Sequence, residues 1–244
     1  MTIIRNFANT AAFLSVTGQY TSANLSGTIS TSQVTGLATV ATTGSASDIT
    51  TGTLPSSVYT AGATGVPTMN VYTSSGTWTK PATVKAIKVT VVGGGGAGGA
   101  NYQPTGNSGG GGGGGGTAIR TYPAPSLPGP QPYTVGGTSS FGVAPVTVIS
   151  ATAGSTGGPG NGGLSGVGGV GASGQANMAG SAGGANGYGI GGSSSMGGGS
   201  AVKADGPGNP GGAYGGGGGS TTGTGGNYPG GSGAAGVVIV EEFY

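Results

Sequence analysis

The clearest alternation of apolar and polar positions lies in residues 84–92. Ile87, Val89 and Val91 fall on one side of an extended chain there, whereas Lys88 and Thr90 fall on the other. A two-residue period with β-branched side chains is typical of a β-strand with one buried face. The pattern therefore predicts a strand that runs directly into a glycine tract.

Other apolar runs predict further strands. Residues 236–244 are mostly apolar, and we expect them to pair with residues 87–92. Trp78 lies in a short strand that Pro81 ends, and we expect its ring in the core. Shorter candidate strands cover residues 117–122, 132–135, 139–141 and 146–151. The pattern predicts an all-β fold with a small β-sandwich. We expect both ends of each long loop to be anchored in this sandwich.

Residues 1–65 differ, because they are rich in Ser, Thr and Ala with spaced apolar residues. A weak repeat relates residues 26–34 to residues 51–58. Short Thr, Ile and Val strands broken by glycine fit a repeating β architecture. One such unit has too few large apolar groups to bury its own core. We predict an N-terminal fibrous β shaft or attachment segment in which chains wind together as a homotrimer, with a flexible linker as the alternative.

Glycine accounts for 64 of the 244 residues and is concentrated in residues 93–116 and 154–236. Because glycine loses the most backbone entropy on folding, its abundance requires a structural reason. Without Cβ atoms, extended helices with three residues per turn can pack closely and hydrogen-bond. We predict polyglycine-II-like loops of this kind within a glycine-rich β domain at residues 66–244. Mobile loops are the alternative.

Composition argues against catalysis. The chain has no His and no Cys, six Lys or Arg and four Asp or Glu, with a net charge of +2. A Ser-His-Asp triad, a Cys-His pair and zinc or iron–sulfur sites are therefore excluded. Glu241 and Glu242 are neighbours in a predicted strand, so they point to opposite faces. We expect no enzyme activity, no cofactor and no metal.

Charge and hydropathy also limit the partners. No basic cluster of the kind that binds nucleic acid occurs, and no apolar run is long enough to insert in a membrane.

Several motifs, in order, resemble the glycine-rich domain of bacteriophage tail fibres and receptor-binding adhesins. The first is Gly-Thr-Trp-Thr-Lys-Pro at residues 76–81, followed by the strand and glycine tract at residues 87–99. The others lie at residues 116–120, 133–137, 139–142 and 231–244. The resemblance covers residues 70–244. The proline-dense residues 122–132 depart from it, because a plain strand and turn is usual there.

The resemblance implies a virion structural protein that mediates adsorption to the host cell. It implies recognition of a host surface glycan or outer-membrane protein, and attachment to other tail or baseplate proteins through the N-terminal segment. The expected location is the virion tail, after synthesis in the host cytoplasm. Alternatives are a connecting fibre component without host binding, and a non-phage glycine-rich structural or ice-binding protein.

Aromatic and amide side chains in the glycine tracts are the candidate receptor-binding residues. A Tyr ring can stack on a sugar face while Asn hydrogen-bonds hydroxyl groups. The same side chains could instead space and pin packed glycine segments, and both interpretations stay open. The candidates are Asn101, Tyr102, Asn186, Tyr188, Tyr214, Asn227 and Tyr228, and the tracts also contain Met178 and Met196.

Overall fold

The computed structural model describes residues 67–102, 109–144, 148–160, 162–185, 189–223 and 226–244. The chain divides into two compact units, Met1–Thr60 and Ala61–Tyr244. The first unit lies outside the described residues, and with it the predicted N-terminal shaft. The second unit contains all of the described residues.

The regular elements of the described residues are β-strands and one 3-10 turn, η5 (Ala124–Ser126), with no α-helix. A five-stranded sheet has the order β1–β12–β3–β4–β9, and a second has the order β2–β5–β6–β7–β8. Strands β10 and β11 form a separate parallel pair. The bounds are β1 Thr68–Tyr72, β2 Gly76–Trp78, β3 Ala86–Val92, β4 Thr117–Pro123, β5 Gln131–Thr134, β6 Ser139–Phe141, β7 Ile149–Ala151, β8 Gly171–Ala172, β9 Ala176–Met178, β10 Lys203–Ala204, β11 Thr221–Thr222 and β12 Val237–Phe243.

The C-terminal strand β12 lies between β1 and β3 and is antiparallel to both. Val238 pairs with Val91, and Val240 pairs with Val89. The predicted pairing of the last residues with residues 87–92 is therefore confirmed, and so is the all-β class.

The core lies between the two five-stranded sheets. Val89 and Val91 from the first sheet pack with Phe141 and Ile149 from the second, and all four are fully buried. Trp78 is 2% exposed, as predicted, and its ring centroid lies 6.1 Å from that of Phe141.

One carboxylate is buried beside this core. Trp78 Nε1 donates a 2.7 Å hydrogen bond to Glu242 Oε1, and Tyr244 Oη donates one of 2.8 Å to Oε2. Glu242 is only 5% exposed. Because an unpaired buried charge is costly, these two donors make the burial of Glu242 tolerable.

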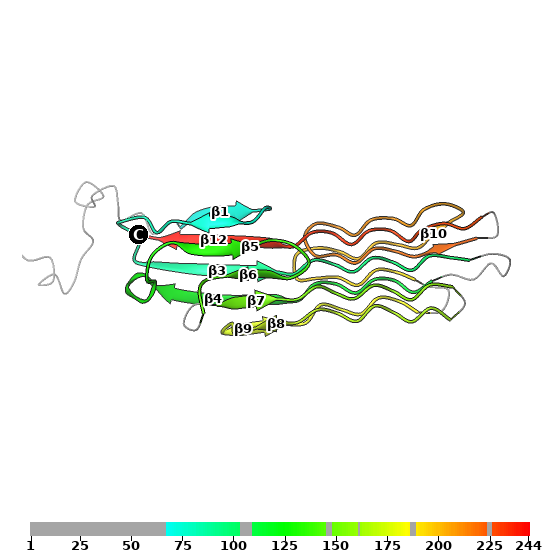
Figure 1. Cartoon of the computed structure of the whole chain (residues 1–244), viewed down its shortest axis with the longest axis horizontal. Coiled ribbons are helices and arrows are strands. Elements are labelled where there is room, and N and C mark those ends of the chain that lie inside the picture. The colour runs from blue at the N-terminus through cyan, green and yellow to red at the C-terminus, as the bar shows by residue number, and fades with distance from the viewer. Residues whose placement is uncertain (1–66, 103–108, 145–147, 161, 186–188, 224–225) are drawn as a thin grey trace, which may run out of the picture. The chain divides into compact units, whose positions relative to one another are not determined.

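The glycine-rich segments extend from one end of the sandwich and run side by side (Figure 1). They are joined by main-chain hydrogen bonds. Within the run 109–116, the N–H groups of Gly110 and Gly113 donate to the carbonyls of Gly158 and Ser155. Every third residue thus faces the same neighbour, which is the repeat of an extended helix with three residues per turn.

The register of the strands continues into the bundle. Val92 of β3 pairs with Thr117 of β4, and the next residue, Gly93, donates its N–H to the carbonyl of Gly116. Further from the sheet, the N–H groups of Gly96 and Gly99 donate to the carbonyls of Gly113 and Gly110, which continues the register of β3 and β4. The N–H of Gly98 donates to the carbonyl of Gly231, which continues the register of β3 and β12. The sheet therefore sets the alignment of the glycine segments.

In the described part of the chain, two segments have neighbouring segments on six sides. They are the two longest unbroken glycine runs of the sequence, residues 109–116 and 215–219. A Cβ atom on Gly113 would overlap the carbonyl oxygen of Val167. The neighbours of the first run are residues 93–99, 152–158, 163–170, 180–184, 189–193 and 215–218. Those of the second are residues 93–98, 109–116, 189–192, 197–201, 208–212 and 230–234. These positions require glycine because main chain lies on every side.

Surface segments need glycine where they face the interior of the bundle or lie against a neighbouring segment, as Gly168 does against Gly180. In residues 163–170, a Cβ on each inward glycine would overlap neighbouring main chain, whereas the residue after each is an exposed apolar side chain. The inward residues are Gly163, Gly166 and Gly169, and the exposed ones are Leu164, Val167 and Val170.

We expect Trp78→Phe to lower the free energy of unfolding by about 1–3 kcal/mol, because it leaves one oxygen of a buried carboxylate without its donor. Urea denaturation followed by circular dichroism measures this. The control is Lys88→Gln, which removes the 2.7 Å ion pair with Glu241 from a partly exposed site and should cost less than about 1 kcal/mol. Equal losses in the two variants would contradict the proposed role of Trp78.

Burial raises the pKa of Tyr122 to about 12, although Arg120 partly opposes the rise. The folded state therefore holds the phenolic proton more tightly than the unfolded state, where the pKa is near its ordinary value of 10.0. This contribution to stability is complete below pH 10 and is lost as the pH rises toward 12. We expect the free energy of unfolding, measured at stepped pH, to fall over this range. The free energy of unfolding of Tyr122→Phe should fall less steeply over this pH range. A slope equal to that of the wild type would contradict the assignment to Tyr122.

We expect Gly113→Ala to destabilise the protein by about 1–3 kcal/mol or more, because the added methyl group must displace packed main chain. The matched control is Gly198→Ala. Its added Cβ would meet no atom within 4 Å, so this substitution should change stability by about 0.5 kcal/mol at most. Thermal and urea denaturation compare the two. Similar stabilities would mean that the bundle is not packed as described.

Candidate functional site

The candidate residues in the glycine tracts lie in two places. Asn101, Tyr102, Asn227 and Tyr228 come together at the end of segments that leave the sandwich at β3 and return to it at β12, and we call these four the tip cluster. Tyr214 lies near the sandwich. A Cβ atom added to the next residue, Gly215, would contact the side chain of Val92 in β3.

Two further candidates, Asn186 and Tyr188, lie outside the described residues.

Asn101 joins two segments of the bundle. Its side chain is fully buried, and its Nδ2 donates to the carbonyls of Gly223 at 3.1 Å and Gly226 at 3.2 Å. Its Oδ1 accepts a 2.7 Å hydrogen bond from the N–H of Tyr228, whose carbonyl in turn accepts the N–H of Asn101. All of these bonds are to main chain, so Asn101 positions the tip cluster.

The other members of the tip cluster form its surface. Tyr102 is 54% exposed and lies against Gly160, where a Cβ would sit 3.4 Å from its ring. Asn227 is exposed and Tyr228 is half-buried. An exposed ring, an amide and a second ring, none of them charged, can stack on a ligand and hydrogen-bond its hydroxyl groups.

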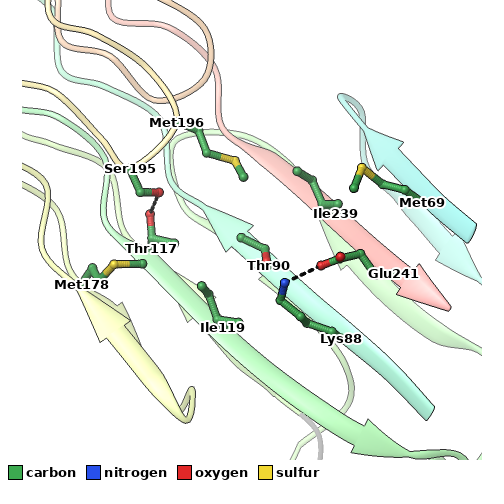
Figure 2. Close-up of a pocket in the computed structure, with 10 residues that line it drawn as sticks. All are labelled: Met69, Lys88, Thr90, Thr117, Ile119, Met178, Ser195, Met196, Ile239 and Glu241. Atoms are coloured by element: carbon green, nitrogen blue, oxygen red, sulfur yellow. Dashed lines mark hydrogen bonds and ion pairs between the residues drawn. The ribbon is translucent and has the colours of Figure 1, made fainter. Parts of the chain in front are cut away.

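A second surface is a groove on the outer face of the sheet β1–β12–β3–β4–β9 (Figure 2). Its volume is about 310 Å³. Two polar contacts cross its floor: Lys88 Nζ lies 2.7 Å from Glu241 Oε2, and Thr117 Oγ1 lies 2.6 Å from Ser195 Oγ. The lining residues are Met69, Lys88, Thr90, Thr117, Ile119, Met178, Ser195, Met196, Ile239 and Glu241.

Sequence reasoning did not predict this groove, because its methionines come from distant parts of the chain. One local signal was present. Residues 237–240 and 89–92 contain apolar residues on both faces of their strands, which is the pattern of strands covered on two sides.

Among the residues that the structure describes, no group of three or more Asp, Glu, His or Cys side chains could hold a metal ion. Within the same residues, no helix is long and apolar enough to span a bilayer.

A family model described as a glycine-rich domain matches residues 70–143. This part of the chain carries a glycine-rich domain. The match includes the run 109–116 and strands β2 to β6, whereas β12 and the segments that complete the bundle lie beyond it. No match was found among the curated proteins. The match itself says nothing of phage tails, so that resemblance stays a prediction.

Proposed function

We propose that this chain is a non-enzymatic structural and receptor-binding subunit of a bacteriophage tail fibre, and that its tip cluster contacts the host surface. The observation that carries the proposal is the exposed Tyr102 and Asn227 on adjacent segment ends, held in register by the buried Asn101. A site fixed on packed segments loses little conformational entropy when it binds.

The bundle supports this function mechanically. Its main-chain hydrogen bonds fix the segments from the sandwich outward, so the tip cluster is held by the sheet. The ligand is a host surface glycan or an outer-membrane protein, and the subunit acts in the virion tail as a homotrimer joined to other tail proteins through its N-terminal segment. Several fibres per particle multiply weak contacts into firm adsorption.

A connecting fibre component without host binding is the second candidate function. The side chain of Asn101 favours it, because its hydrogen bonds to Gly223, Gly226 and Tyr228 all serve the main chain. In that case the tip cluster only closes the end of the bundle.

We expect Tyr102→Ala to weaken binding of the purified chain to receptive bacterial cells by about tenfold or more, as the loss of an aromatic anchor does. Flow cytometry with a fluorescently labelled chain across a panel of bacterial strains measures this. Val170→Ala is the control, because Val170 is 52% exposed and bridges Ala179 at the sandwich end of the bundle, away from the tip cluster. If Tyr102→Ala binds as well as the wild type, or if the wild type binds to no strain, the connecting component is favoured.

A further inference from the structure

The charges of the glycine-rich segments are confined to one place. Residues 93–116 and 154–236 contain two charged side chains, Lys203 and Asp205. Both are exposed. Lys203 is in β10, at the end of the bundle away from the sandwich, and Asp205 follows this strand (Figure 1). Charges that served solubility alone would be spread over the surface, so their position indicates a function at this end.

The turn that carries these charges is fixed by hydrogen bonds. The N–H of Asp205 donates to the carbonyl of Thr222 at 2.7 Å, and the hydroxyl of the fully buried Thr221 donates to the carbonyl of Gly206 at 2.6 Å. Asp205 has a φ of 47°, in the left-handed region that Asp and Asn adopt more often than other residues with a side chain. Its carboxylate therefore extends from a well-positioned main chain.

The charged turn adjoins the tip cluster at Gly223. A Cβ atom added to Gly223 would overlap Asp205 Oδ1, so the carboxylate packs against this glycine. The carbonyl of the same glycine accepts the 3.1 Å hydrogen bond from Asn101 Nδ2. Asp205 is thus one residue away from the side chain that positions Tyr102 and Asn227. The acid, the amides and the aromatic ring share one end of the bundle.

The two charged side chains contact different neighbours. The stem of Lys203 crosses Gly206, where an added Cβ would lie 3.3 Å from Lys203 Cε, whereas Asp205 packs on Gly223. The described residues hold no ion pair between the two. An ionised carboxylate only accepts hydrogen bonds and can accept from two adjacent hydroxyl groups, whereas an ammonium group only donates. Hydrogen bonds to charged groups are also stronger than those between neutral groups.

This set of side chains fits a neutral sugar. Tyr102 offers a ring for stacking, and the amide of Asn227 both donates and accepts. A ligand with a net charge would be attracted by one of the two neighbouring charges, Lys203 and Asp205, and repelled by the other. A neutral ligand with adjacent hydroxyl groups uses both, because each hydroxyl donates and accepts.

We propose that Asp205 and Lys203 complete the tip cluster as a binding site for a neutral glycan. The Asp205 carboxylate accepts hydrogen bonds from two adjacent hydroxyl groups of one sugar, and the Lys203 ammonium donates to a hydroxyl oxygen. Asp205 determines specificity, because a site built to bond a hydroxyl group rejects a ligand that lacks it. The inference rests on the proposed function and identifies its ligand as a glycan.

The first test is binding of the labelled full-length chain to receptive bacterial cells. We expect Asp205→Asn to weaken binding by about tenfold or more, because the amide keeps the left-handed turn but removes the charge and one acceptor. Lys203→Gln should weaken binding by about two- to fivefold. The control Lys85→Gln removes the same charge from an exposed position just before β3, at the end of that strand away from the bundle. It should bind as the wild type does. Thermal denaturation verifies that each variant is folded.

Treatment of the cells identifies the class of ligand. Periodate cleaves the bond between carbons that carry adjacent hydroxyl groups, so we expect it to abolish binding of the wild type. Protease treatment of the cells should leave binding intact. Added salt should change binding little, because a neutral ligand has no charge to be screened. Binding that survives periodate but not protease, or that salt abolishes, would overturn the proposal.

This inference and the proposed function fail in different ways. If Tyr102→Ala loses binding while Asp205→Asn keeps it, the tip cluster binds the host but Asp205 does not select the ligand, so only this inference is overturned. If the wild type binds no cells, an array of purified neutral and acidic bacterial polysaccharides decides. Binding to a neutral polysaccharide that Asp205→Asn loses supports the glycan site without host adsorption. Binding to acidic polysaccharides alone, or to none, overturns it.

Discussion

A buried peptide group must find a hydrogen-bond partner, and the glycine bundle meets this requirement without a side-chain core. Segments with three residues per turn can hydrogen-bond to neighbours on all sides only where no Cβ atom separates them. The run 109–116 is the extreme case, because other main-chain segments surround it on six sides. Its composition follows from its position: any side chain there would enter a neighbour's carbonyl group.

The sandwich gives the bundle its alignment. Isolated glycine segments could slide along one another in steps of three residues, since each step restores the same contacts. Strands β3, β4 and β12 prevent this, because the pairing of Val92 with Thr117 and with Val237 fixes the bonds of the glycines that follow. A conventional core, with Trp78 and Phe141 at its centre, thus positions a region that has none.

The two candidate surfaces use this arrangement differently. The tip cluster depends on the bundle, because Asn101 aligns two segments and leaves Tyr102 exposed beside them. The groove depends on the sheet, whose outer face the bundle covers as far as Met196. One surface presents aromatic rings and amides, and the other presents methionine side chains around a Lys88–Glu241 ion pair.

The sequence by itself determined the local elements. The alternation in residues 84–92, the apolar C-terminal run and the burial of Trp78 could be read because a strand has a two-residue period. The sequence also located the glycine tracts, but it did not show which of them lie at the centre of the bundle. Only the tertiary structure decided that, as it decided the burial of Asn101 and the meeting of Met69 with Met178 and Met196. Period and composition are properties of neighbouring residues, whereas a lattice position or a groove is made by segments that are distant along the chain.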